Sequence, residues 1–120
     1  ANTIMVGEVR AGPKSSAVRG TWALSNIGAS FIGGCPTGDC WGPNDTNSGS
    51  DDVAGCTAMP TQRMGCWNGG NGQATMRGNH EAGANCVFVD GSVHYLNNNI
   101  DLTTFFWLLS RDDGFTPSNY

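Results

Sequence analysis

The stretch Asn85-Cys86-Val87-Phe88-Val89-Asp90-Gly91-Ser92-Val93-His94-Tyr95-Leu96 decides the fold. Two apolar runs flank Asp90-Gly91, a pair that tolerates the positive φ angles of a two-residue type I′ turn. The stretch therefore predicts an antiparallel β-hairpin. Cys86 lies within the first apolar run, where we expect a buried free thiol.

The residues that follow the hairpin predict a helix, and those that precede it predict two more strands. Asp101 can cap a helix from Leu102 to about Arg111, which has one apolar face. Asn2 to Val9 and Arg19 to Leu24 have the pattern of strands. The predicted fold class is α+β: a small antiparallel sheet of about four strands, a C-terminal helix and long loops, similar to a pilin head.

Length and composition exclude some classes of function and indicate a small, loop-rich domain. The 120 residues are expected to form a single domain, 1–120, and the net charge of −4 argues against binding to nucleic acid or to a membrane surface. No apolar run approaches the roughly 20 residues that span a bilayer. Eighteen Gly, 12 Asn and 5 Pro favour loops, and residues 26–72 show little periodicity. We therefore expect a thin core that needs covalent staples.

Five cysteines provide candidates for such staples. Cys35 and Cys40 can close one small loop, and Cys56 and Cys66 can close another. The odd count leaves at least one cysteine free or paired outside the chain. The paired Cys-x2-Cys spacing that is typical of zinc sites is absent. Two disulfides would indicate an oxidising, extracytoplasmic compartment.

His80 is followed, after nine residues, by Asp90-Gly91. This spacing resembles the C-terminal H-x9-DG motif of a pilin-like, or pseudopilin-like, family that abounds in planctomycete-type bacteria and is treated as a domain of unknown function. The resemblance covers nearly the whole chain. Other stretches that resemble blocks of this family are Asn2–Glu8, Arg19–Trp22, Asp51–Cys56, Met64–Trp67, Gln73–Thr75 and Ile100–Thr103.

The resemblance implies similarity to type IV pilins and to the pseudopilins of type II secretion. Such proteins begin with a prepilin leader and a long apolar helix, so we expect this chain to be the C-terminal part of the globular head. The implied location is extracytoplasmic, and the implied partners are other pilin-like subunits of the full-length form. His80-Glu81-Ala82-Gly83 departs from the His-Pro-Gly-Gly that is frequent in the family.

The same motif offers the first candidates for catalysis. His80 and Asp90 can form a proton relay, or a metal site together with Glu81. The alternative, which we favour, is a structural clasp. Ser92 lies close in sequence to Asp90 and His94, but we expect the turn to separate them. Carboxylates that could cleave glycosidic bonds are Glu8, Glu81, Asp51 and Asp52.

An acidic loop offers a candidate calcium site. Asp45, Asn47, Asp51 and Asp52 supply oxygens at short intervals, as in the opening of a calcium loop. Gly49 at the fifth position and Cys56 at the twelfth exclude an EF-hand. A solvated acidic loop is the alternative that we favour. No cofactor is required, and calcium remains a candidate ligand.

The four tryptophans separate into two groups. Trp22 in the predicted strand and Trp107 on the predicted helix are expected in or beside the core. Trp41 and Trp67 lie in polar, Gly-rich loops. There they can form an exposed platform for carbohydrate, since an aromatic ring offers a flat apolar face beside amide groups. The alternative, which we favour, is that they plug the loops against the sheet.

The sequence thus predicts the head of a pilin-like or pseudopilin-like subunit, structural or associated with secretion. Two other classes stay open. One is a hydrolase of ester or glycosidic bonds in polymers, which would use His80 and Asp90. The other is a carbohydrate-binding module that would use Trp41 and Trp67. For both, the partner would be a polysaccharide or polyester surface.

Overall fold

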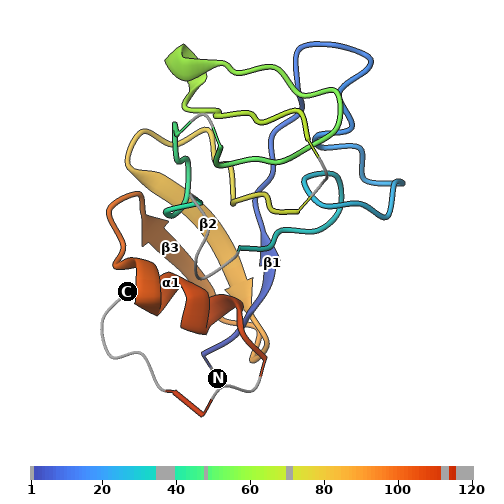
Figure 1. Ribbon diagram of the computed structural model, residues 1–120. Helices are drawn as coiled ribbons and strands as arrows, with labels where there is room; N and C mark the ends of the chain where they lie inside the picture. Colours follow the sequence, from blue (N-terminus) through green and yellow to red (C-terminus); the bar gives the residue numbers. More distant parts are fainter. Residues whose placement is uncertain (1, 35–39, 48, 70–71, 112–113, 116–120) are drawn as a thin grey trace.

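The predicted hairpin forms the centre of the sheet. The computed structural model describes residues 2–34, 40–47, 49–69, 72–111 and 114–115. Strand β2 (Gly83–Phe88) pairs antiparallel with β3 (Val93–Asn97), and β1 (Ile4–Gly7) pairs antiparallel with the other edge of β2. Helix α1 (Leu102–Leu109) follows, and a short 3-10 helix, η1 (Pro60–Gln62), lies in the loops (Figure 1).

The turn of the hairpin differs from the predicted type. Gly91 alone has a positive φ, 84°, while Asp90 does not. The Gly91 amide donates to the Phe88 carbonyl, and the Phe88 amide donates to the Ser92 carbonyl, both at 2.9 Å. This is the pattern of a type I turn that ends in a left-handed glycine. The prediction of a hairpin is confirmed, but the prediction of a type I′ turn is wrong.

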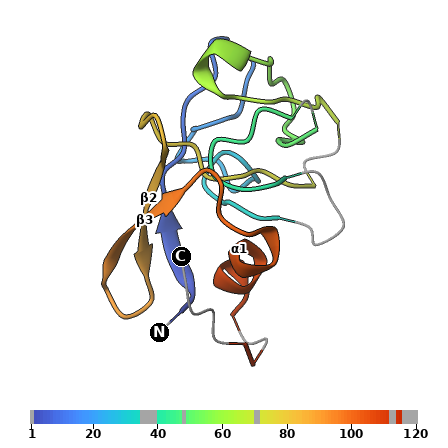
Figure 2. The same ribbon diagram turned by 90° about the vertical axis from the view of Figure 1, so that its left-hand side faces the viewer.

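One face of the sheet carries the main core. Residues of a strand alternate between its two faces, and Ala84, Cys86 and Phe88 of β2 point to the same side as Leu96 of β3. Helix α1 covers this inner face with Phe105 and Leu108 (Figure 2). Cys86 is the predicted buried free thiol.

Helix α1 begins where the sequence predicts. The Asp101 carboxylate accepts a hydrogen bond of 2.9 Å from the Thr104 amide, the geometry of an N-terminal cap. The helix ends at Leu109, two residues earlier than expected, because Ser110 adopts an extended conformation. Trp107 stacks on Phe115, with ring centroids 4.6 Å apart.

The predicted strand at Arg19 to Leu24 is wrong. Successive turns occupy this segment: Thr21 donates to the Val18 carbonyl, and Leu24 donates to the Thr21 carbonyl. Without a partner strand, an extended conformation leaves its backbone groups unbonded. Trp22 is therefore 87% exposed, not in the core, and the described sheet has three strands rather than about four.

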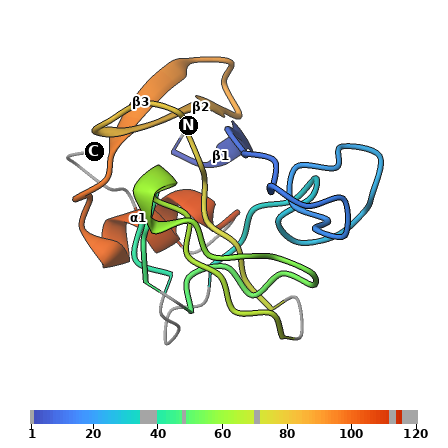
Figure 3. The same cartoon turned by 90° about the horizontal axis from the view of Figure 1, so that it is seen from above.

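The long loops form a second layer that is joined to the sheet through residues 72–82. Val53, Cys56 and Ala74 make a small core of their own, closed by the disulfide between Cys56 and Cys66. Cys40 is a buried free thiol, and Cys35, its expected partner, lies outside the described residues. Figure 3 shows the loops gathered beside the sheet and α1. The α+β class is confirmed.

Among the described residues, no helix has both the length and the apolar character that crossing a membrane requires.

Candidate functional site

The outer face of the sheet, opposite α1, carries a row of three valines, of which Val6 and Val93 are exposed and Val87 is half-buried. Val87 of β2 lies between Val6 of β1 and Val93 of β3, and all three point away from the core. Val93 is 71% exposed. A shallow groove of about 300 Å³ runs along this row. No described segment covers this face in Figures 2 and 3.

A polar cluster of Glu8, His80 and Asn85 borders the valine row. The Glu8 Oε2 atom accepts from the Asn85 amide nitrogen at 2.7 Å, and Glu8 Oε1 accepts from Asn85 Nδ2 at 3.1 Å. Nε2 of His80 lies 2.8 Å from Asn85 Nδ2 and 3.3 Å from Glu8 Oε1. A Cβ atom at Gly78 would lie 2.5 Å from Glu8 Oε2, so glycine leaves room for the carboxylate. The cluster thus connects the end of β1 to the loop before β2.

The hydrogen bonds of this cluster limit its chemistry. Asn85 Nδ2 donates to Glu8 Oε1, and His80 Nε2 lies within hydrogen-bonding distance of both residues, where one tautomer accepts from Asn85 and the other donates to Glu8. Partial burial raises the pKa of Glu8, but the hydrogen bonds from Asn85 and the nearby His80 lower it further than burial raises it. The carboxylate stays ionised and bonded. Within the cluster, no hydroxyl or thiol lies ready for His80 to activate, so the arrangement suits a clasp.

The structure does not bring His80 and Asp90 together. They lie beyond opposite ends of β2, whose six residues extend about 20 Å. Asp90 sits at the tip of the hairpin, where it accepts from the backbone and hydroxyl of Ser92 at 2.9 and 2.6 Å. These bonds hold the pKa of Asp90 well below its usual range. Asp90 therefore stabilises the turn.

The expectation that the turn separates Ser92 from Asp90 and His94 is wrong. Ser92 Oγ also lies 2.8 Å from His94 Nε2, and the His94 ring stacks on Phe88. The single hydroxyl proton of Ser92 goes to Asp90, so His94 faces the oxygen as a donor. A catalytic serine instead gives its proton to histidine. These three residues do not have the arrangement of a catalytic triad.

The residues expected to bind calcium have other partners. Asp45 accepts from the Trp41 and Asn47 amides, and Asp52 accepts from the Gly72 amide. Asn47 accepts from Gly49. In the part of the chain that the structure describes, no group of three His, Cys, Asp or Glu side chains could hold a metal ion. Glu81 lies with His80 on a polar depression of about 280 Å³, apart from these loop residues.

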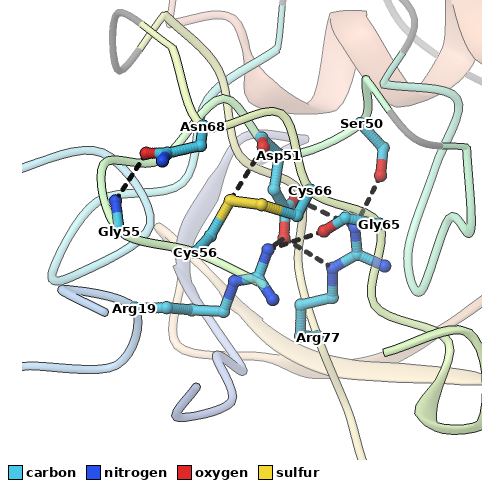
Figure 4. The surroundings of a disulfide bond; sticks show 9 residues. All are labelled: Arg19, Ser50, Asp51, Gly55, Cys56, Gly65, Cys66, Asn68 and Arg77. Carbon is cyan, nitrogen blue, oxygen red and sulfur yellow. Dashed lines mark hydrogen bonds and ion pairs between the residues drawn. A yellow bond between two sulfur atoms is a disulfide. The ribbon is translucent and has the colours of Figure 1, made fainter. Parts of the chain in front are cut away.

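Asp51 belongs to a buried cluster that the sequence analysis missed. Its carboxylate pairs with Arg19 at 2.8 Å and with Arg77 at 2.9 Å, beneath the Cys56–Cys66 disulfide (Figure 4). The sequence signal was weak: Arg77 ends an uncharged run that begins at Met64. Because both arginines hold Asp51, it is unavailable as a calcium ligand or as a catalytic acid.

Both loop tryptophans are exposed, so the favoured prediction that they pack the loops against the sheet is wrong. Trp41 is 60% exposed and Trp67 is 64% exposed. Trp41 lines an open groove of about 500 Å³, together with the loop that joins β3 to α1. Trp67 does not line this groove; its backbone bonds to Asp51 and Val53 beside the disulfide. The structure therefore places the two rings in separate surroundings.

Comparison with known proteins gives a family for the chain. The sequence model of a family described as "Protein of unknown function (DUF1559)" matches residues 1–103. No curated protein and no solved structure matches the chain.

Proposed function

The chain belongs to the DUF1559 family of proteins of unknown function, and from this membership we propose that it is the extracytoplasmic head of a pilin-like subunit. Its role is structural: the head packs against other subunits of an assembly and makes or breaks no covalent bond. A part in secretion, as for a pseudopilin, belongs to the same proposal.

The valine row on the outer sheet face, with exposed Val6 and Val93 on either side of half-buried Val87, carries this proposal. Val6, Val87 and Val93 form one continuous apolar strip across all three strands. A strip of this kind on a small domain marks a surface for another protein, because exposed apolar area is costly in water. Glu8, His80 and Asn85 at its border add hydrogen-bonding groups, as the polar rim of an interface does. We infer that a neighbouring subunit covers the strip.

The H-x9-DG motif has a structural explanation on this account. His80 connects the base of the hairpin to β1 through Asn85 and Glu8, and Asp90 holds the tip through Ser92. The motif thus fixes the two ends of the hairpin whose outer face docks. This supports the clasp over the hydrolase, for which the cluster provides no activated nucleophile.

The disulfide supports the extracytoplasmic part of the proposal, since reducing compartments keep thiols free. Denatured extracts of producing cells can be treated with a maleimide polymer, with and without prior reduction. We expect reduction to expose Cys56 and Cys66 and to add two polymer units. Labelling of both residues without reduction would contradict the proposed location.

Site-specific cross-linking tests the docking face. A photoreactive amino acid at Val93 in producing cells should give adducts with other pilin-like subunits, identified by mass spectrometry. The same group at Lys14, exposed in a loop, is the matched control and should give few. Equal adducts at both positions, or none at Val93, would refute docking through this face.

A further inference from the structure

We propose that the groove beside Trp41 binds carbohydrate, at a site separate from the outer sheet face. The groove has a volume of about 500 Å³, within the range of about 300–1,000 Å³ that small-molecule sites occupy. Three segments meet there: the loop from Trp41 to Thr46, Arg63 after η1, and the connection between β3 and α1.

The frame of the groove is fixed by hydrogen bonds. Buried Asn44 donates to the carbonyl of Gly83 at 2.9 Å and to Oδ1 of Asn98 at 3.0 Å, which ties the loop to the sheet. The Arg63 carbonyl accepts from buried Arg77 at 2.6 Å. Asp45 holds the Trp41 amide at 2.9 Å. Such support keeps the ring in place before a ligand arrives, which lowers the entropic cost of binding.

Backbone strain gathers at the same place. Among the described residues, Asn44 and Arg63 are the non-glycine residues with positive φ, 55° and 51°, and both line the groove. This conformation is uncommon for residues other than glycine, and strained residues cluster at ligand sites. The two strained residues thus line the same groove as the exposed ring of Trp41.

The groups that line the groove match the chemistry of a sugar. The exposed ring of Trp41 offers a flat apolar face for the C–H side of a pyranose. Around it, no described residue is bonded to the Asn99 side-chain amide, the Thr46 hydroxyl or the Arg63 guanidinium, which are open to hydroxyl groups. Arg63 can in addition pair with the carboxylate of an acidic sugar. The net charge of −4 makes a nucleic acid the weaker candidate.

The same groove is suited to binding and not to cleavage. Glycoside hydrolysis needs two carboxyl groups on either side of the scissile bond. Among the described residues, Asp45 is the carboxylate that lines the groove, and its two oxygens accept from the Trp41 and Asn47 amides. The groove therefore retains a sugar chain without breaking it.

Calorimetric titration with soluble oligomers of glucose, xylose and galacturonic acid tests the proposal. We expect at least one oligomer to bind. Trp41→Ala should weaken its binding by about tenfold or more, the effect of truncating an aromatic residue that dominates binding. Trp67→Ala is the matched control, since this ring is equally exposed but outside the groove, and it should bind as the unchanged protein does.

A second variant tests the groove independently if Trp41→Ala unfolds. Asn99→Ala removes a groove amide whose side chain supports no other part of the described structure, and it should also weaken binding. A preference for the galacturonic acid oligomer that disappears in Arg63→Met would assign the acidic class. Failure of all three oligomers to bind, an equal loss in Trp67→Ala, or binding of a proline-rich peptide in their place would overturn the proposal.

Discussion

At the scale of single residues, Arg77 carries its charge inside the protein. Its side chain is 1% exposed, and all five of its N–H donors have acceptors in Asp45, Ser50, Asp51 and Arg63. The guanidinium thereby connects the acidic loop to the segment that follows η1. Burying a charge is costly unless the charge is paired and hydrogen-bonded, as that of Arg77 is.

Arg77→Met should therefore destabilise the fold strongly. It leaves Asp51 with a single arginine partner and the carbonyls of Asp45 and Arg63 without this donor, and loss of one partner of a buried pair costs about 3–5 kcal/mol. Urea denaturation measures the loss. Arg10→Met is the control, because Arg10 bonds Gln62 at the surface and such contacts contribute about 0–1 kcal/mol. Similar losses in both variants would contradict the account of the cluster.

Glu8 makes stability depend on pH. Its pKa in the folded protein is lower than its ordinary value of 4.5, so the ionised form is the one the fold stabilises. This contribution is complete above pH 4.5 and is lost as the pH falls through the lower folded pKa. Asp90 and Asp101 also have lowered pKa values, so the unchanged protein loses further stability in acid.

Glu8→Gln should flatten part of this acid dependence. Urea midpoints measured between neutral pH and pH 3 should fall less steeply in the variant than in the unchanged protein. Glu81→Gln is the matched control, because Glu81 lies next to His80 in sequence but outside the hydrogen bonds around Asn85. If the dependence of the urea midpoint on pH changes equally in both variants, the hydrogen bonds of Glu8 are not the cause of the acid sensitivity.

At the scale of elements, the hairpin depends on one backbone conformation. Gly91 has a φ of 84°, and a Cβ atom there would meet no atom within 4 Å. Gly91→Ala should cost about 1–2 kcal/mol, the penalty of a left-handed conformation for an L-residue. Gly91→Asn should cost less, because asparagine adopts this conformation more readily. Thermal unfolding of the two variants compares them, and an equal cost would mean that the alanine is harmful for another reason.

The loop layer depends on its disulfide. Cys56 and Cys66 close a loop with a sequence separation of 10, and the small core of Val53 and Ala74 lies against them. The double change Cys56→Ser and Cys66→Ser should lower stability by about 3 kcal/mol, from the freedom regained by the unfolded chain. Chemical denaturation measures it. Unchanged stability would mean that the loop layer keeps its fold without the disulfide.

The sequence predicts elements best where their signals are local. The hairpin and helix α1 rest on a turn glycine, alternating apolar residues and the Asp101 cap, all within a few residues. The strand expected around Trp22 depended on a partner elsewhere in the chain, which local pattern does not reveal. The buried pairing of Asp51 with Arg19 and Arg77 spans up to 32 residues, and the surface cluster of Glu8 with Asn85 spans 77. Such contacts form between segments that are distant in the sequence, so no local pattern predicts them.

The two free cysteines also differ in how well local sequence predicts their surroundings. Both Cys40 and Cys86 are buried free thiols, and burial raises their pKa values to about 12 and about 11. The apolar run around Cys86 predicted its burial, whereas nothing local distinguished Cys40 from a disulfide partner. Raised pKa values keep both thiols protonated and unreactive in the folded protein.

At the scale of the whole molecule, the two layers have different surfaces. The sheet and α1 enclose the main core and expose the valine row, while the loop layer supplies exposed tryptophan rings and the Trp41 groove. We propose that the first surface assembles the protein with its neighbours and that the second meets carbohydrate. The proposed head would then present its loops to the surroundings while its sheet is covered.

The most direct test of the central claim is the size of the native complex in producing cells when the valine row is charged. Val93→Asp places a carboxylate on the most exposed valine of the row without touching the core. We expect the purified variant to keep its thermal stability and the complex extracted from cells to fall to single subunits. Trp22→Asp, a control outside the sheet, should leave the complex intact. A complex of unchanged size in Val93→Asp would contradict the account.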